Sequence, residues 1–142
     1  GLGDVYKRQA AWSCANVSGI AINDFCEMRG HYDHRKTMEQ IATDVKNSAY
    51  EIIAKKHATY YGIAMSVRRI CEAIVRDEKS ILPISSMMHG EYGLEDVVLS
   101  MPAVIGKNGM ETKVPLDLNY EEVTNLQTSA KALHKVLQEN QI

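Results

Sequence analysis

The sequence predicts an α+β fold, with a long kinked helix pair and a C-terminal helix packed on an antiparallel β meander. Three observations lead to it. Apolar residues recur every three or four positions between residues 38 and 74, which is helical periodicity. Short β-rich runs separated by turn residues occupy 80–115, and a helix-capping signal then opens a final amphipathic stretch. Since no strand–helix–strand unit carries a glycine fingerprint, this chain alone is not expected to bind a dinucleotide in the usual way.

The beginning of the chain differs from the remainder. Read back into codons, residues 1–9 resemble a transposon adapter used in sequencing libraries, so we expect a scar at 1–9 and one domain at 10–142, with the gene extending upstream. Residues 10–26 predict a short helix or loop followed by a strand-like piece near Val17–Ile22, which Gly19 interrupts. Residues 27–34 are polar and are expected to form a loop.

A long helix is expected to begin near Arg35. Its apolar residues fall on one face, which predicts that the following are buried: Met38, Ile41, Ala42, Val45, Ala49, Ile52 and Ile53. A bend is expected at His57–Thr59. A second helix should then run to about Arg76, with these residues inward: Ile63, Val67, Ile70, Cys71 and Ile74.

The stretch from Ser80 to Pro115 predicts the meander. Pro83 suggests an edge strand, because proline cannot donate a hydrogen bond to a neighbouring strand. Asn108-Gly109 between two β-rich runs is a hairpin signal, since both residues tolerate positive φ. The final helix should start at Asn119, which forms a capping-box pair with Glu122. Its expected buried stripe is Val123, Leu126, Ala130, Leu133, Val136 and Leu137.

Composition limits the possible functions. The 142 residues carry a net charge of -2, with basic residues dispersed among acids, which gives no electrostatic basis for binding nucleic acid. No apolar run approaches the ~18 residues that a membrane span requires. The three cysteines are odd in number and have no C-x-x-C spacing, so a reducing, cytoplasmic setting is the simplest interpretation.

Few residues present the spacing of a reactive centre. His31 and His34 have an H-x-x-H spacing but lack the further ligands that zinc normally needs, so no metal site is expected. Ser13-Cys14 has no evident base, and no catalytic residue is assigned. The Met87-Met88 pair is expected to fill gaps in the core.

One segment does indicate a chemistry. Residues 55–65, K-K-H-A-T-Y-Y-G-I-A-M, resemble a segment of bacterial L-lactate dehydrogenases, which belong to the lactate/malate dehydrogenase superfamily. Supporting stretches, in the same order, are A-W-S-C-A-N-V-S-G-I (11–20), A-Y-E-I-I (49–53), H-G-E-Y-G-L-E-D-V (89–97) and P-A-V-I-G-K-N-G (102–109). The resemblance implies the C-terminal substrate domain of a cytoplasmic homotetramer. That enzyme reduces pyruvate to L-lactate with NADH, so it uses NAD as its cofactor.

The resemblance also implies roles for three residues. Thr59 would hydrogen-bond the substrate carboxylate, Ala49 would line the pocket as a small residue, and Ile63 would pack on the nicotinamide ring. The family's catalytic histidine would fall at position 4, where this sequence has Asp4, so the chain itself is expected to be inactive. The family's usual glycine in K-K-G-A-T is His57 here. If this position requires a positive φ, histidine tolerates that conformation less well than glycine.

Other interpretations remain open from the sequence. If the family resemblance is set aside, Thr59 is interpreted as a helix N-cap and Ile63 as a core residue. Tyr60 and Tyr61 are interpreted as packing residues whose hydroxyls face solvent. A malate or other L-2-hydroxyacid dehydrogenase is the nearest alternative activity. A non-enzymatic α+β interaction domain, with residues 1–9 native, is the alternative from another class.

Overall fold

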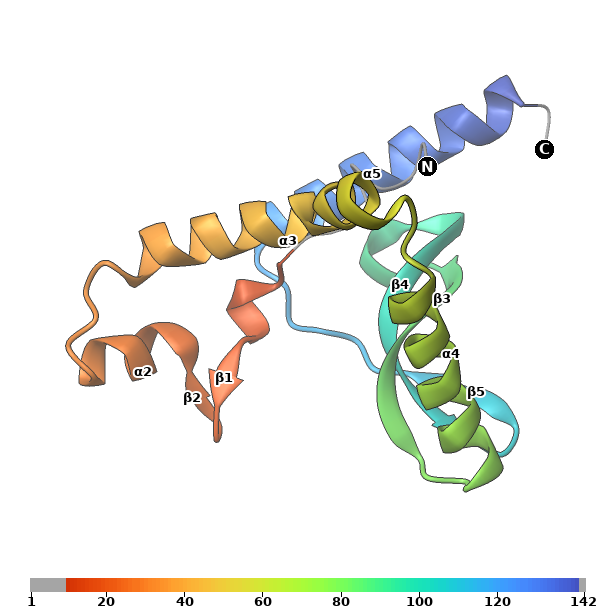
Figure 1. Cartoon of the computed structure of the whole chain (residues 1–142), viewed down its shortest axis with the longest axis horizontal. Helices are drawn as coiled ribbons and strands as arrows, with labels where there is room; N and C mark the ends of the chain where they lie inside the picture. Colours follow the sequence, from red (N-terminus) through yellow and green to blue (C-terminus); the bar gives the residue numbers. More distant parts are fainter. Residues whose placement is uncertain (1–9, 141–142) are drawn as a thin grey trace. The chain divides into compact units, whose positions relative to one another are not determined.

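The computed structural model describes residues 10–140 and confirms the α+β class (Figure 1). The expected scar at residues 1–9 lies outside the described residues. The chain divides into two compact units, of which one contains residues up to Glu51 and from Asp117 onward, and the other contains Ile52–Leu116. None of the helices within 10–140 is long and apolar enough to cross a membrane.

The first unit is mainly helical. It contains η1 (Trp12–Cys14), β1 (Asn16–Val17), β2 (Ile20–Ala21), α2 (Ile22–Met28), the larger part of α3 (His34–Lys56) and α5 (Tyr120–Glu139). The strands β1 and β2 pair antiparallel, and Gly19 between them has a φ of 85°. The strand-like piece interrupted by Gly19 is therefore confirmed.

The sequence did not predict α2. Seven residues are too few to show a helical period, so its last residues were included in the expected polar loop. The turn after α2 is held by His34, the buried first residue of α3. Its Nδ1 lies 2.8 Å from the carbonyl oxygen of His31, and its Nε2 lies 3.1 Å from Oδ1 of Asn23. Both ring nitrogens are thus engaged within the first unit.

The start of α5 confirms the predicted capping box. The Glu122 amide donates to Oδ1 of Asn119 at 2.9 Å, and the Asn119 amide donates to Oε2 of Glu122 at 3.0 Å. The amide and hydroxyl of Ser13 also donate to the Glu122 carboxylate. Burial raises the pKa of Glu122, but these donors outweigh it and the net shift is downward. Glu122 therefore connects two segments of the first unit that are far apart in sequence.

The expected burial of the α3 face is wrong for much of the helix. Ile41, Val45, Ile52 and Ile53 are exposed, whereas the other predicted members, Met38, Ala42 and Ala49, are half-buried. Periodicity identifies which face of a helix is apolar, but it does not supply the surface that covers it. In α5 the prediction is closer, since Ala130 is buried and only Leu137 of the predicted stripe is exposed.

The second unit is a helix packed on a three-stranded sheet. It contains the end of α3, α4 (Tyr60–Val75), β3 (Ser80–His89), η2 (Glu91–Gly93), β4 (Glu95–Gly106) and β5 (Gly109–Lys113). The strand order is β3-β4-β5 with antiparallel pairing throughout, so the meander is confirmed. Pro83 lies in the edge strand β3, as predicted.

The core of this unit lies between α4 and β4. Ala73 of α4 packs with Ala103 and Ile105 of β4, and Ile74 and further apolar side chains surround them. Along β4, buried and more exposed residues alternate, as expected of a strand with one covered face. Of the two methionines expected to fill core gaps, only Met88 is buried; Met87 on the opposite face of β3 is exposed.

Two turns connect the strands. In the β4–β5 hairpin, Gly106 pairs with Gly109, and of the Asn-Gly dipeptide only Gly109 has a positive φ. The hairpin is confirmed, but the glycine alone provides the left-handed residue. After β3, Glu91 accepts hydrogen bonds from Lys113 Nζ and from the His89 amide, both at 2.6 Å. These bonds lower the pKa of Glu91 to about 2.

Candidate functional site

The segment at residues 55–65 forms the break between α3 and α4. The amide of His57 donates to the carbonyl oxygen of Ile53 at 2.7 Å, and His57 has a φ of 63°. A single residue in the left-handed region after the last helical residue is a common way to end a helix. The bend predicted at His57–Thr59 is confirmed, and the position that holds histidine instead of glycine does require positive φ.

Thr59 is the N-cap residue of α4, and its carbonyl oxygen accepts a hydrogen bond from the Ile63 amide at 3.3 Å. The side chain makes no capping hydrogen bond. A threonine at this position usually accepts from the backbone amide of N2 or N3. Because the half-buried hydroxyl is not used in this way, it can serve another partner.

One face of α4 connects this residue to the core. Its members follow alternating spacings of four and three residues, which place them in a row along a helix: Thr59, Ile63, Ser66, Ile70 and Ala73. The C-terminal part of the row is covered, since Ala73 is 0% exposed and packs against β4. The N-terminal part is uncovered, since Ile63 is 60% exposed and Val67 beside it is 53% exposed.

The inward set predicted for α4 is therefore only partly right. Ile70 and Ile74 are half-buried, but Ile63, Val67 and Cys71 are exposed. Cys71 lies one residue beyond the row, on the side of the helix that turns away from the sheet. The sheet covers only the C-terminal half of the helix, so the apolar face extends beyond its support. The same reasoning applies to Tyr60 and Tyr61, which are exposed where packing was expected.

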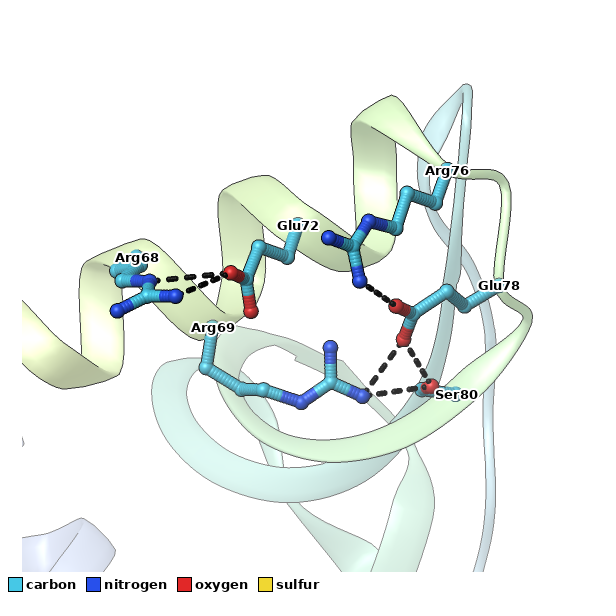
Figure 2. A network of polar contacts seen from close by, with 6 residues as sticks. All are labelled: Arg68, Arg69, Glu72, Arg76, Glu78 and Ser80. Carbon is cyan, nitrogen blue, oxygen red and sulfur yellow. Dashed lines mark hydrogen bonds and ion pairs between the residues drawn. The ribbon is translucent and has the colours of Figure 1, made fainter.

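The uncovered part of this face is electrically neutral. The first charged residues of α4 are Arg68 and Arg69, and both are engaged (Figure 2). Arg68 pairs with Glu72 at 3.0 Å, while Arg69 lies 2.7 Å from Glu78 and 2.9 Å from the Ser80 hydroxyl. The hydrogen bond from Arg69, followed by that from Ser80, lowers the pKa of Glu78.

The predicted site residues are only partly brought together. Thr59 and Ile63 lie one helical turn apart on the same uncovered face of α4. Ala49 is a half-buried residue of α3 and belongs to the first unit, whereas Thr59 and Ile63 belong to the second. The sequence prediction did not include Gly62 and Ser66 in the site, although their spacing of three and seven residues from Thr59 places them on this face.

The described residues offer no alternative centre for a metal ion. No group of three or more His, Cys, Asp or Glu side chains within 10–140 is placed to hold one. A mainly apolar hollow of about 460 Å³ does lie in the first unit, between the Trp12 region and the start of α3. His34 lines it, but both of its ring nitrogens already have partners.

Comparison with known proteins identifies the family of the chain. Residues 7–141 match the family described as "lactate/malate dehydrogenase, alpha/beta C-terminal domain". The chain belongs to this family. Its uncovered α4 face is accordingly a surface of a lactate/malate dehydrogenase C-terminal domain, and membership weighs against the alternative of a non-enzymatic interaction domain.

Several similar proteins are L-lactate dehydrogenases. An L-lactate dehydrogenase of Thermoanaerobacterium saccharolyticum is 44% identical over 130 residues, which cover 92% of this chain and 42% of the relative. An L-lactate dehydrogenase 1 of Clostridium acetobutylicum is also 44% identical, over 90% of this chain and 41% of the relative. The chain thus spans about two fifths of the length of the curated relatives it matches.

Solved structures show the same lactate/malate dehydrogenase fold. The minor L-lactate dehydrogenase of Enterococcus mundtii in its ligands-bound form is 38% identical with a TM-score of 0.84, over 92% of this chain and 41% of that one. A malate dehydrogenase of Archaeoglobus fulgidus in complex with NADH is 40% identical with a TM-score of 0.66. That match covers 71% of this chain and 34% of the malate dehydrogenase.

Proposed function

We propose that this chain is the substrate domain, at 10–142, of an NAD-dependent L-lactate dehydrogenase that reduces pyruvate to L-lactate. The observation that carries the proposal is the uncovered, neutral half of the α4 face, where a hydroxyl without a capping bond stands one turn from an exposed isoleucine. Such a surface suits a small keto acid beside a flat apolar ring. A core role for Ile63 does not explain its 60% exposure.

In this proposal the chain supplies one wall of the reaction site. Thr59 donates a hydrogen bond to the carboxylate of the keto acid, and Ile63 packs against the nicotinamide ring and excludes water from it. Ala49 keeps its part of the pocket small. The cofactor supplies the hydride, and the exposed apolar side chain of Ile63 is a suitable surface for its nicotinamide ring to pack on. No described residue is assigned the role of proton donor, so the chain by itself is inactive.

The test uses a chimera in which residues 10–142 replace the matched portion of the T. saccharolyticum enzyme. NADH oxidation with pyruvate is followed spectrophotometrically. Thr59→Val should lower kcat/KM for pyruvate by about 10- to 100-fold, since a hydrogen bond to a charged group contributes about 1.5–3 kcal/mol. Thr59→Ser, which keeps the hydroxyl, should retain most of the activity. A folded chimera that does not oxidise NADH with pyruvate would refute the proposal.

Ile63 is tested with a matched control. Ile63→Asn should raise KM for NADH, because a polar side chain would replace the apolar wall. Ile81 on β3 is also 60% exposed, so Ile81→Asn makes the same chemical change at the same exposure outside the proposed site. Equal effects of the two substitutions would show that Ile63 has no special relation to the cofactor.

Malate dehydrogenase activity is the second candidate, favoured by the structural similarity to the A. fulgidus enzyme. The chimera cannot separate the two activities if the upstream portion determines selectivity. Kinetics of the protein with its own upstream portion, on pyruvate and on oxaloacetate, separates them. A kcat/KM that is higher for oxaloacetate would assign the chain to the malate branch.

We also propose that the whole protein is a cytoplasmic homotetramer. The exposed apolar residues of α3, including Ile41 and Val45, support contact with further polypeptide. The unpaired cysteines suit a reducing compartment. Light scattering on the whole protein tests the tetramer, and a monomer at micromolar concentration would exclude it.

A further inference from the structure

Gly62 occupies a helical position that does not itself require glycine. It lies in the first turn of α4 with no left-handed φ, and a Cβ built there would meet no atom within 4 Å apart from its neighbours and the backbone of its own helix. Glycine within a helix is less favourable than alanine by up to about 1 kcal/mol. Neither the backbone conformation nor the packing of the described residues accounts for it. The reason therefore lies in whatever occupies the open space beside it.

Helix geometry locates that space relative to the proposed site. Gly62 follows Thr59 by three residues, which places it about 60° to one side of Thr59 around the helix axis. Ile63 follows by four residues and lies about 40° to the other side. In the proposed site, the carboxylate of the keto acid lies at Thr59 and the nicotinamide ring of the cofactor lies at Ile63. Gly62 would then border the flank away from the ring.

The neighbouring side chain leaves this flank open. The Ser66 hydroxyl, one turn further along, donates to the carbonyl oxygen of Gly62 at 3.1 Å. The hydroxyl is therefore directed onto the helix backbone. The flank thus consists of a glycine and a serine whose hydroxyl has a partner in the helix.

We propose that Gly62 sets the size of the 2-oxo acid side group that the site accepts. This inference rests on the proposed function and adds a specificity-determining position to it. Without a side chain at this position, the alkyl group of the substrate has room beside Thr59. A side chain here would narrow that room, and it would affect longer 2-oxo acids more than pyruvate.

The experiment measures kcat/KM for pyruvate and for 2-oxobutanoate in the chimera described above. Gly62→Val should raise the preference for pyruvate over 2-oxobutanoate about tenfold, since one methylene in a confined pocket changes kcat/KM by a factor of about 10 or more. Gly62→Ala should shift the ratio in the same direction by less, and alanine favours the helix. KM for NADH should not change with either variant, because the ring lies on the other flank.

Ala64→Val is the matched control. Ala64 is exposed in the same helix but lies about 140° from Thr59, so the added methyl groups face away from the site. Its substrate ratio should equal that of the parent chimera. Thermal unfolding of every variant reports whether the added bulk instead disturbs contact with the remainder of the enzyme.

The outcomes separate this inference from the proposed function. A folded but inactive chimera refutes both. An active chimera in which Gly62→Val changes kcat/KM equally for both acids, or changes neither, refutes the role of Gly62 alone. A loss of thermal stability without a change in the substrate ratio would assign the open space to packing by the upstream portion, and it would also overturn the inference.

Discussion

Replacing His57 with glycine should stabilise the chain at the bend between its two long helices. His57 has a φ of 63°, a region that costs a residue with a Cβ roughly 1–2 kcal/mol. Glycine removes this strain but loses about 0.5–1 kcal/mol more backbone entropy on folding. The side chain of His57 is exposed, and the hydrogen bond from its amide to Ile53 is retained in the variant. The strain term is larger, so the net gain should be about 0.5–1 kcal/mol.

The measurement is urea and thermal unfolding of residues 10–142, followed by circular dichroism. A gain of this size should raise Tm by about 2–5 °C in a chain of this length. His57→Ala is the decisive control, because it removes the imidazole but keeps the Cβ that causes the strain. Alanine should give no stabilisation. If His57→Gly and His57→Ala have the same stability, or if glycine destabilises the chain, positive φ is not a source of strain at this position.

Three further predictions concern stability. Asn119→Ala should reduce the free energy of unfolding by about 1 kcal/mol, because it removes the N-cap of α5. Asn125→Ala within the same helix should change it little. Equal effects of the two substitutions in urea unfolding would contradict the capping role. The hydrogen bonds to the ionised Glu91 stabilise the protein above pH 4.5, and this stabilisation is lost as the pH falls toward 2. Glu91→Gln should therefore flatten the pH dependence of the free energy of unfolding across this interval. An unchanged pH profile would contradict this role of Glu91. Gly106→Ala should destabilise the hairpin mainly at low salt. The added Cβ would lie 2.5–2.7 Å from the charged ends of Glu111, Asp77 and Lys79 and would disturb their ion pairs, which salt screens. A loss of stability that persists in 1 M NaCl would indicate a backbone clash instead.

The elements could be predicted from the sequence because each long one carries a local signal. The bend at His57–Thr59, the edge strand with Pro83 and the capping box at Asn119 all depend on the chemistry of a few adjacent residues. The helix α2 could not be predicted, because seven residues span only two turns and show no period. Its junction with α3 depends on contacts of His34 with His31 and Asn23 that no local pattern encodes.

Burial was the less predictable property. The apolar period in α4 correctly predicted that Ile74 packs against the core and that Ile70 is at least half-buried, but the same period continues through Ile63, where the sheet no longer covers the helix. The sequence alone does not distinguish a covered apolar face from an uncovered one, since both have the same spacing. For Ile63 the family resemblance suggested a ligand surface instead of a core, and that role stays a prediction. The resemblance made no such suggestion for Cys71, which was expected in the core and is exposed.

Under the proposed function, the charges of α4 limit what this chain contributes to binding a keto acid. A carboxylate against the uncovered face requires a cation, yet Arg68 and Arg69 are already paired with Glu72 and Glu78. Arg68 also lies about 180° from Thr59 around the helix axis, so its charge is on the opposite side of the helix. Under the proposed function, the countercharge for the keto acid therefore comes from outside this helix. In the proposed site, α4 contributes a hydroxyl, an apolar wall and an open flank, which would determine the orientation and shape of the substrate more than its affinity.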